Sequence, residues 1–325
     1  MVVSVLLFLL GFVLLIKGGN WFVDGAVGIA HRFKLPELLI GATVVSIGTT
    51  LPEVMVSSQA AVQGNAGISY GNAIGSIICN TSLIAAITIA VKPGKANRKS
   101  LVLPFSFFTA AAIVYALIAW THGSFERWHG IVFLMTFATY MVLSVLQMKK
   151  NPEAAGESGA EGEDGSKQKA LWMETGLLAV GAAVIAVGAN LLVENGTIIA
   201  QALGVPDSVI GLTMVALGTS LPELVTAITS LIKGHGALSL GNVIGANLFN
   251  IVLVCGTAIT ISPFAVPAEK TIAGMNSSLV IDIPLMLLVM AIMCIPAMLK
   301  ERLYRWQGIM LLCIYAVFTA YQFVS

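Results

Sequence analysis

The sequence predicts an all-α integral membrane protein, and three observations lead to that fold class. Of its 325 residues, 57% are hydrophobic and 10% are charged, and the mean hydropathy is +0.92. A soluble domain has about 25% charged residues, so this chain has too few charges to cover a surface that faces water. Its apolar residues form continuous stretches of the length of a membrane-spanning helix, without the alternation of a β-barrel. These features exclude a soluble enzyme, a secreted disulfide-rich protein and a disordered chain.

Ten apolar stretches lie between polar breaks, and each is predicted to cross the bilayer as a helix. They cover residues 2–29, 37–62, 68–91, 101–121, 129–148, 171–199, 206–232, 239–262, 274–298 and 304–323. The first stretch lacks a preceding basic segment, so it is interpreted as a helix and not as a signal peptide. One long polar segment is rich in Gly, Glu, Ser and Lys, a composition typical of flexible linkers. We therefore divide the chain into residues 1–148, a flexible linker at 149–170, and residues 171–325.

Lysine and arginine residues predict the orientation in the membrane. With the N-terminus outside, 14 of the 17 basic residues fall in or beside inside loops, whereas only Arg127 and Lys270 lie outside and Lys17 lies within the first span. Because cytoplasmic loops carry an excess of basic residues, we expect a multi-pass protein of the cell inner (plasma) membrane. Both termini are then outside and the linker is cytoplasmic.

An internal repeat relates the two halves at an offset of 170 residues. Residues 41–53 (GATVVSIGTTLPE) and 211–223 (GLTMVALGTSLPE) are identical at eight of thirteen positions. Residues 71–80 (GNAIGSIICN) and 241–250 (GNVIGANLFN) are identical at five of ten. Because each half contains five spans, an odd number, the second half enters the membrane in the opposite sense. Two inverted five-helix repeats are typical of secondary transporters, whose binding site lies near the midplane between the repeats.

The first motif places a proline and a glutamate near the middle of the second and seventh spans. Pro52 and Pro222 each remove a backbone N–H and so free a carbonyl four residues earlier. The next residues, Glu53 and Glu223, are carboxylates at a depth where a charge costs on the order of 3 kcal/mol. Neither span contains a basic residue, whereas carboxylate, hydroxyl and carbonyl oxygens form the shell that Ca²⁺ prefers. A kinked helix with locally satisfied glutamates is the alternative, but it does not explain why both copies keep these residues.

The second motif places an asparagine at equivalent positions of the third and eighth spans, Asn80 and Asn250. Their side-chain carbonyls are candidate ligands, and a role in packing or an inter-helix hydrogen bond is the alternative. The glycines that precede them are expected to allow close approach of neighbouring helices: Gly71, Gly75, Gly241 and Gly245.

At these residues the sequence resembles the cation/calcium exchanger superfamily and, within it, the prokaryotic sodium/calcium antiporters. The paired motifs G-T-[ST]-L-P-E and G-N-x-[IV]-G-x-x-x-x-N carry the resemblance, which covers the whole chain. It implies a sodium/calcium exchanger-like fold in which the first and sixth spans slide across the other eight. It also implies an ion site with central carboxylates from Glu53 and Glu223, carbonyls from Thr49, Thr219, Ser46 and Ala216, hydroxyls from Thr50, Ser220 and Ser76, and the side chains of Asn80 and Asn250.

Two positions depart from part of that family. Residue 250 is Asn where some relatives have Asp, and residue 246 is Ala where others have Ser. The neutral Asn250 argues against potassium co-transport, and Ala246 weakens one peripheral Na⁺ site.

The sequence therefore predicts a secondary antiporter that exports Ca²⁺ in exchange for Na⁺ by alternating access, with both ions competing for one midplane site. A proton/Ca²⁺ exchanger of the same fold is the alternative, and a Ca²⁺ channel is a more distant one. We expect a chain that functions as a monomer in the lipid bilayer, with Ca²⁺ and Na⁺ as substrates. No cofactor or enzymatic activity is expected, since the four histidines lie in loops or at the edge of a span, and the net charge of +1 gives no reason to expect a nucleic-acid partner.

Overall fold

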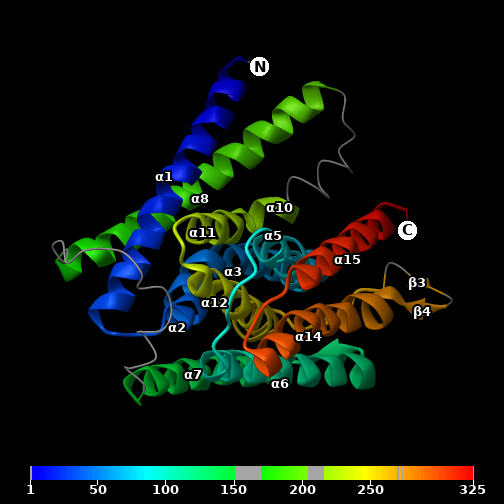
Figure 1. Ribbon diagram of the computed structural model, residues 1–325. Helices are drawn as coiled ribbons and strands as arrows, with labels where there is room; N and C mark the ends of the chain where they lie inside the picture. The colour runs from blue at the N-terminus through cyan, green and yellow to red at the C-terminus, as the bar shows by residue number, and fades with distance from the viewer. Residues whose placement is uncertain (1, 151–169, 204–215, 269–270, 273, 325) are drawn as a thin grey trace.

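The computed structural model describes residues 2–150, 170–203, 216–268, 271–272 and 274–324, and these ranges are helical almost throughout (Figure 1). Most of the predicted linker therefore lies outside the described residues. Within them, eight helical stretches are long and apolar enough to cross a membrane, and these coincide with eight of the ten predicted spans. The predicted span 304–323 is helix α15 (Arg305–Val324), and the predicted span 206–232 is described from Ala216 onward.

The helices of the two halves follow one another in the same order. The first half contains α1 (Val2–Arg32), α2 (Glu37–Ile40), η1 (Gly41–Val45), α3 (Ser46–Val62), α4 (Ala66–Cys79), η2 (Asn80–Ala85), α5 (Ala86–Val91), α6 (Arg98–His122) and α7 (Arg127–Lys150). The second half contains α8 (Leu171–Ala202), α10 (Ala216–Thr219), α11 (Leu221–Ile232), α12 (Gly236–Phe249), η5 (Asn250–Cys255), α13 (Gly256–Ile261), η6 (Ser278–Asp282), α14 (Ile283–Lys300) and α15. The segments labelled η are π-helical turns.

Among the described residues, four short strands lie between the long helices, and the sequence predicted none of them; one lies within the predicted span 274–298, which is helical only from Ser278. Strand β1 (Ser124–Phe125) pairs antiparallel with β2 (Phe264–Ala265), with Ser124 opposite Ala265. Strand β3 (Thr271–Ile272) pairs with β4 (Met275–Asn276). The first pair joins the loop after α6 to the loop after α13, and so connects the two halves.

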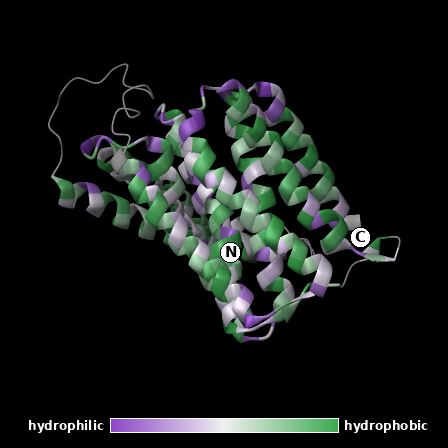
Figure 2. Ribbon diagram, turned by 90° about the horizontal axis from the view of Figure 1, so that it is seen from below, coloured by the Kyte–Doolittle hydropathy of each residue, from purple (hydrophilic) through white to green (hydrophobic). Residues whose placement is uncertain are grey.

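The main core surrounds α12, in which every residue from 238 to 249 is buried. Helix α12 is surrounded because it packs against η1, α3, α6, α11 and η2. Hydrophobic residues run along the helices, while hydrophilic ones gather mainly at helix ends and connections (Figure 2). Cys79, Cys255 and Cys294 are buried among the apolar helices, but Cys313 on α15 is exposed.

Helices α1 and α8 form a crossing pair on one side of the other helices (Figure 1). The pair is antiparallel, because Gly11 lies against Gly188 and Gly18 lies against Gly181. A Cβ added to Gly18 would lie 2.9 Å from the Ile185 backbone nitrogen, so the two backbones touch along this line. Glycines permit such close approach of membrane helices, and the opposite sense of α1 and α8 is that expected for inverted repeats.

Two ion pairs hold this helix pair at one end. Arg32 on α1 and Glu174 on α8 form a double contact, with Nε to Oε2 at 2.7 Å and Nη2 to Oε1 at 3.2 Å. Lys233, which follows α11, donates from Nζ to Asp24 Oδ1 at 2.6 Å and to the Asn20 carbonyl at 3.2 Å. The first ion pair joins α1 to α8, whereas the second joins α1 to the rest of the bundle.

Candidate functional site

Two carboxylates lie buried at the centre of the bundle. Glu53 on α3 and Glu223 in the first turn of α11 are each 0% exposed, and they are close enough to interact electrostatically. No oxygen atom of either carboxylate has a hydrogen-bond partner among the described residues, and neither helix carries a basic residue. Two buried charges of one sign without donors are strongly unfavourable. The arrangement is therefore suited to holding a cation or a proton between the carboxylates.

The backbone at the two motifs differs between the halves. Helix α3 continues through Pro52, and its irregular turn is the π-helical η1 that precedes it. In the second half the helix stops at Ser220 and restarts as α11 with Pro222 in its first turn, where a proline needs no donor. The sequence predicted a proline inside a helix in both halves, and this is right for Pro52 and wrong for Pro222. Glu223 consequently lies at a helix N-terminus, whereas Glu53 lies inside a helix.

The two predicted asparagines each begin a π-helical turn, η2 at Asn80 and η5 at Asn250. Each π turn packs against the glutamate helix of the other half, since η2 contacts α11 and η5 contacts α3. Both asparagines are 0% exposed. Asn80 has no hydrogen-bond partner for its amide among the described residues, whereas Asn250 donates from Nδ2 to the Ala246 carbonyl at 3.0 Å and leaves Oδ1 unpaired. Each glutamate helix thus lies against the asparagine segment of the opposite repeat.

The predicted hydroxyls lie on these same elements. Thr50 on α3 and Ser220 before α11 are buried, and their hydroxyl oxygens have no hydrogen-bond partner within the described ranges. Ser76 is buried on α4 one helical turn before Asn80, so the two side chains share a face. The sequence analysis missed Thr226, which is buried on α11 with an unpaired hydroxyl. Its spacing of three residues from the second glutamate was the available signal, since it places both on one face of a helix.

Among the residues predicted to give backbone carbonyls, Ala216 and Thr219 begin and end α10, which packs against α4 and α11. Ser46 and Thr49 lie in the first turn of α3 and are buried. All the predicted site residues therefore lie on six neighbouring elements: α3, α4, η2, α10, η5 and the segment that runs from Ser220 into α11.

A second residue that the sequence analysis missed is Asn242, which orders the first turn of α3. Thr49 Oγ1 donates to Asn242 Oδ1 at 3.2 Å, and Ser46 Oγ lies 3.3 Å from the same oxygen. Ser46 also donates to the Gly41 carbonyl at 2.7 Å, across the π turn. Thr49 also lies beside Glu223, so the hydroxyl that bonds to Asn242 places the first turn of α3 next to the carboxylate of the opposite repeat.

The equivalent residue in the first half, Asn72, orders the segment around the other carboxylate. Its Nδ2 donates to the Glu53 carbonyl at 3.2 Å and to Ser57 Oγ at 2.9 Å. Asn72 and Asn242 are related by the 170-residue offset, and both bond to α3, the helix that carries Glu53. The identical Gly-Asn pair in both copies of the second motif was the sequence signal for these two residues.

The predicted close approach at glycines is confirmed in the second half. Carbon atoms added to Gly241 and Gly245 of α12 would overlap the Leu38 carbonyl and Ser46 Oγ, respectively. For Gly71 and Gly75 no described atom lies within 4 Å. Their partner by symmetry is residues 204–215, which lie outside the described residues, so this part of the prediction is untested.

Helices in two inverted repeats, with irregular backbone where the repeats meet, define the class of secondary transporter folds. The chain belongs to the sodium/calcium exchanger protein family, whose profile matches residues 3–146 and 173–324. It is 32% identical over 348 residues to the sodium/calcium exchanger MaX1 of Methanosarcina acetivorans, with 97% of each chain covered. It is also 33% identical over 271 residues to the inner membrane protein YrbG of Escherichia coli, with 81% of each chain covered.

Solved structures of one family member share the fold. The sodium-calcium exchanger NCX_Mj, in a crystal soaked with Na⁺ and Sr²⁺, superimposes with a TM-score of 0.81 at 31% sequence identity, and the match covers 98% of each chain. The predicted fold class, an all-α membrane protein with a sodium/calcium exchanger-like fold, is therefore confirmed.

Proposed function

We propose that this protein is an antiporter that exports Ca²⁺ in exchange for Na⁺, with both ions competing for one site around Glu53 and Glu223. The observation that carries the proposal is the pair of fully buried carboxylates, for which the described residues supply no hydrogen-bond partner and whose own helices carry no basic residue. One Ca²⁺ neutralises two carboxylates, and two Na⁺ do the same. Replacement of one Ca²⁺ by two Na⁺ then leaves no uncompensated charge in the protein interior, where burying such a charge costs free energy.

The other ligands in the proposal are oxygens that lie around these carboxylates. Ca²⁺ is held by six to eight oxygen atoms at about 2.3–2.6 Å, more than two glutamates supply. The remaining positions are assigned to carbonyls of Ser46, Thr49, Ala216 and Thr219, hydroxyls of Thr50, Ser76 and Ser220, and the side chains of Asn80 and Asn250. Unpaired oxygens at Thr50, Ser220 and Asn250 favour Na⁺ over H⁺ as the counter-ion, because a proton needs no such shell.

Alternating access is assigned to the pair of α1 and α8. The two helices pack closely on each other through glycines, and they lie to one side of the elements that carry the site (Figure 1). Movement of this pair over the remaining helices would open the site to one side of the membrane at a time. Because all candidate ligands come from one chain, a monomer is sufficient.

The proposed location is the cell inner (plasma) membrane, with both termini outside and residues 149–170 in the cytoplasm. The unequal distribution of basic residues between the two sets of loops supports this orientation.

Transport of radioactive Ca²⁺ into proteoliposomes tests the proposal. Uptake is expected when the vesicles are loaded with Na⁺, and not when a K⁺ or a H⁺ gradient replaces it. Uptake driven by H⁺ alone would establish the proton/Ca²⁺ alternative, and uptake independent of any counter-ion would indicate a channel.

Substitution of the central carboxylates tests the site itself. Glu53→Gln and Glu223→Gln are each expected to abolish Ca²⁺ uptake while the protein remains folded, because a neutral amide is easier to bury than a charge. Glu194→Gln on α8 is the matched control, since Glu194 is exposed and its substitution should leave uptake unchanged. Near-normal uptake by both central variants would refute the site.

A further inference from the structure

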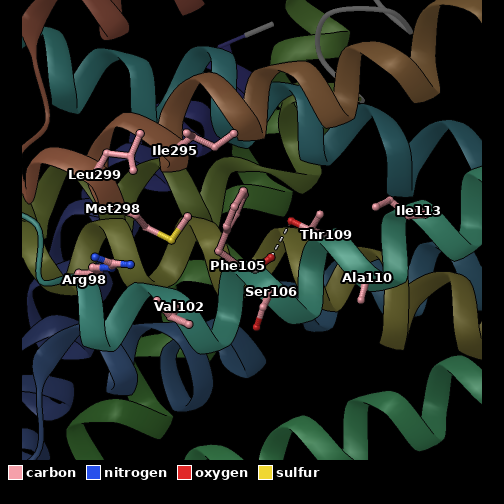
Figure 3. Close-up of a pocket in the computed structure, with 10 residues that line it drawn as sticks. All are labelled: Arg98, Val102, Phe105, Ser106, Thr109, Ala110, Ile113, Ile295, Met298 and Leu299. Atoms are coloured by element: carbon pink, nitrogen blue, oxygen red, sulfur yellow. Dashed lines mark hydrogen bonds between the residues drawn. The ribbon is translucent and has the colours of Figure 1, made fainter.

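A groove with a volume of about 590 Å³ lies between α6 and α14, outside the site described above (Figure 3). Its walls are largely apolar and include Val102, Phe105, Ile113, Ile295, Met298 and Leu299. The two hydroxyls beside it are satisfied by their own helix: Thr109 Oγ1 donates to the Phe105 carbonyl at 2.8 Å, and Ser106 Oγ donates to the Leu103 carbonyl at 2.9 Å. The groove therefore offers no free hydroxyl proton to a polar ligand and is suited to a hydrocarbon chain.

The groove opens outward, to the side of the bundle that a membrane would cover. Ile113 is 46% exposed, Ile295 is 43% exposed and Leu299 is 70% exposed. Apolar side chains with this exposure in a membrane protein face lipid, and a groove between them can admit an acyl chain laterally from the bilayer.

One end of the groove is basic. Arg98, the first residue of α6, is the one charged residue in the lining, and it has no ion-pair or hydrogen-bond partner among the described residues. The connection before α6 is joined to the connection after α14 by two backbone hydrogen bonds, from Ala96 to the Glu301 carbonyl at 2.9 Å and from Leu303 to the Gly94 carbonyl at 2.8 Å. These bonds gather six basic residues and one acidic residue at this end: Lys92, Lys95, Arg98, Lys99, Lys300, Arg302 and Glu301.

The length of the groove matches one leaflet. From residue 98 to residue 113, α6 rises about 22 Å, and half of a bilayer with its headgroup regions is also about 20–22 Å thick. A lipid with its phosphate at Arg98 would therefore reach the other end of the groove with its chain. Because no basic residue lines that other end, the charge distribution selects the leaflet on the side of Arg98.

We infer that the groove between α6 and α14 binds an anionic phospholipid of the cytoplasmic leaflet, with the acyl chain between the two helices and the phosphate on Arg98. Basic pockets between membrane helices on the cytoplasmic side are suited to anionic headgroups. The site is separate from the ion site, and only its assignment to the cytoplasmic leaflet rests on the proposed orientation.

Native mass spectrometry of the detergent-purified protein tests the inference. The protein is titrated with phosphatidylglycerol and with phosphatidylcholine that carries the same acyl chains. Arg98→Gln is expected to weaken phosphatidylglycerol binding about fivefold, the equivalent of about 1 kcal/mol for one basic residue, and to leave phosphatidylcholine binding unchanged. Arg127→Gln, just beyond the opposite end of α6, is the matched control and should change neither.

A second variant tests the contribution of the lipid's acyl chain separately from that of its headgroup. Ala110→Trp places an indole in the groove and is expected to weaken binding of both lipids, and Ser106→Trp serves the same purpose if the first variant does not fold. Wild-type binding of both lipids by a folded tryptophan variant would overturn the inference. Equal loss of phosphatidylglycerol binding in Arg98→Gln and Arg127→Gln would also overturn it, as would binding of inorganic phosphate that competes fully with the lipid.

Discussion

Gly245 lies where α12 crosses the π turn η1. It is not one of the proposed ligands, but its replacement by alanine should disturb the ion site. An added Cβ would lie 2.6 Å from Ala42 Cα and 2.8 Å from the Ala42 carbonyl carbon, and it would overlap Ser46 Oγ. The Ser46 hydroxyl can rotate away, but the Ala42 backbone cannot.

The size of the effect follows from these distances. An ordinary contact between carbon atoms is about 3.5–4.0 Å, so α12 and η1 must separate by about 1 Å. Overpacking of this kind costs about 1–3 kcal/mol of stability. The same displacement moves the first turn of α3, and the distances at which oxygens bind Ca²⁺ span only about 0.3 Å. We therefore expect both a lower melting temperature and weaker Ca²⁺ binding.

Gly236→Ala provides the matched control for this variant. Gly236 begins the same helix, and no described atom lies within 4 Å of the position of its added Cβ. Melting temperature and the Ca²⁺ concentration for half-maximal uptake are measured for both variants. If Gly245→Ala matches Gly236→Ala in both measurements, the close packing of α12 on η1 does not position the site and the reasoning fails.

Three further predictions concern the site and the orientation. Wild-type exchange is expected to run without K⁺, whereas Asn250→Asp adds a carboxyl group to a nearly dry pocket and should make uptake sensitive to K⁺ or pH; identical K⁺ and pH profiles would remove Asn250 from the ion shell. Asn242→Ala removes the acceptor of the Thr49 hydroxyl, so it is expected to lower the free energy of unfolding by about 1–3 kcal/mol and to weaken Ca²⁺ uptake. A control variant in which an exposed asparagine is replaced by alanine should change neither measurement. A cysteine introduced at Gly159 should react with membrane-impermeant reagents only from the cytoplasmic side, and labelling of intact cells would contradict the proposed orientation.

Much of the fold could be predicted from the sequence, because a bilayer imposes simple rules on length and polarity. Nine of the ten predicted spans are helices with ends within a few residues of those expected, and the tenth is described only in part. The repeat also predicted the paired carboxylates, since an acid that recurs at the same offset in two apolar spans needs a shared explanation. These inferences depend on local composition and on spacing along one chain.

The remaining features depend on contacts between helices, which local composition does not encode. The π turns at Asn80 and Asn250 arise where one helix adapts to another, and neither residue has a strong preference for such a turn. Asn242 could be predicted as a repeated residue but not as the partner of Thr49, because that pairing requires the register of α12 against α3. The different positions of Pro52 and Pro222 relative to their helices likewise arise in the assembled bundle.

The two ion pairs at one end of α1 respond differently to dissolved salt. Glu174 is 5% exposed in its pair with Arg32, whereas Asp24 is 45% exposed in its pair with Lys233. Ions screen exposed charges far more than buried ones. If α1 and α8 move together, the pair of Arg32 and Glu174 travels with them, but the contact between Lys233 and Asp24 must break and re-form in every cycle. Raising the ionic strength with an untransported salt only on the side of the membrane where Lys233 and Asp24 lie should then favour the opening movement. The rate of the cycle would therefore depend on the salt concentration of one compartment and not on that of the other.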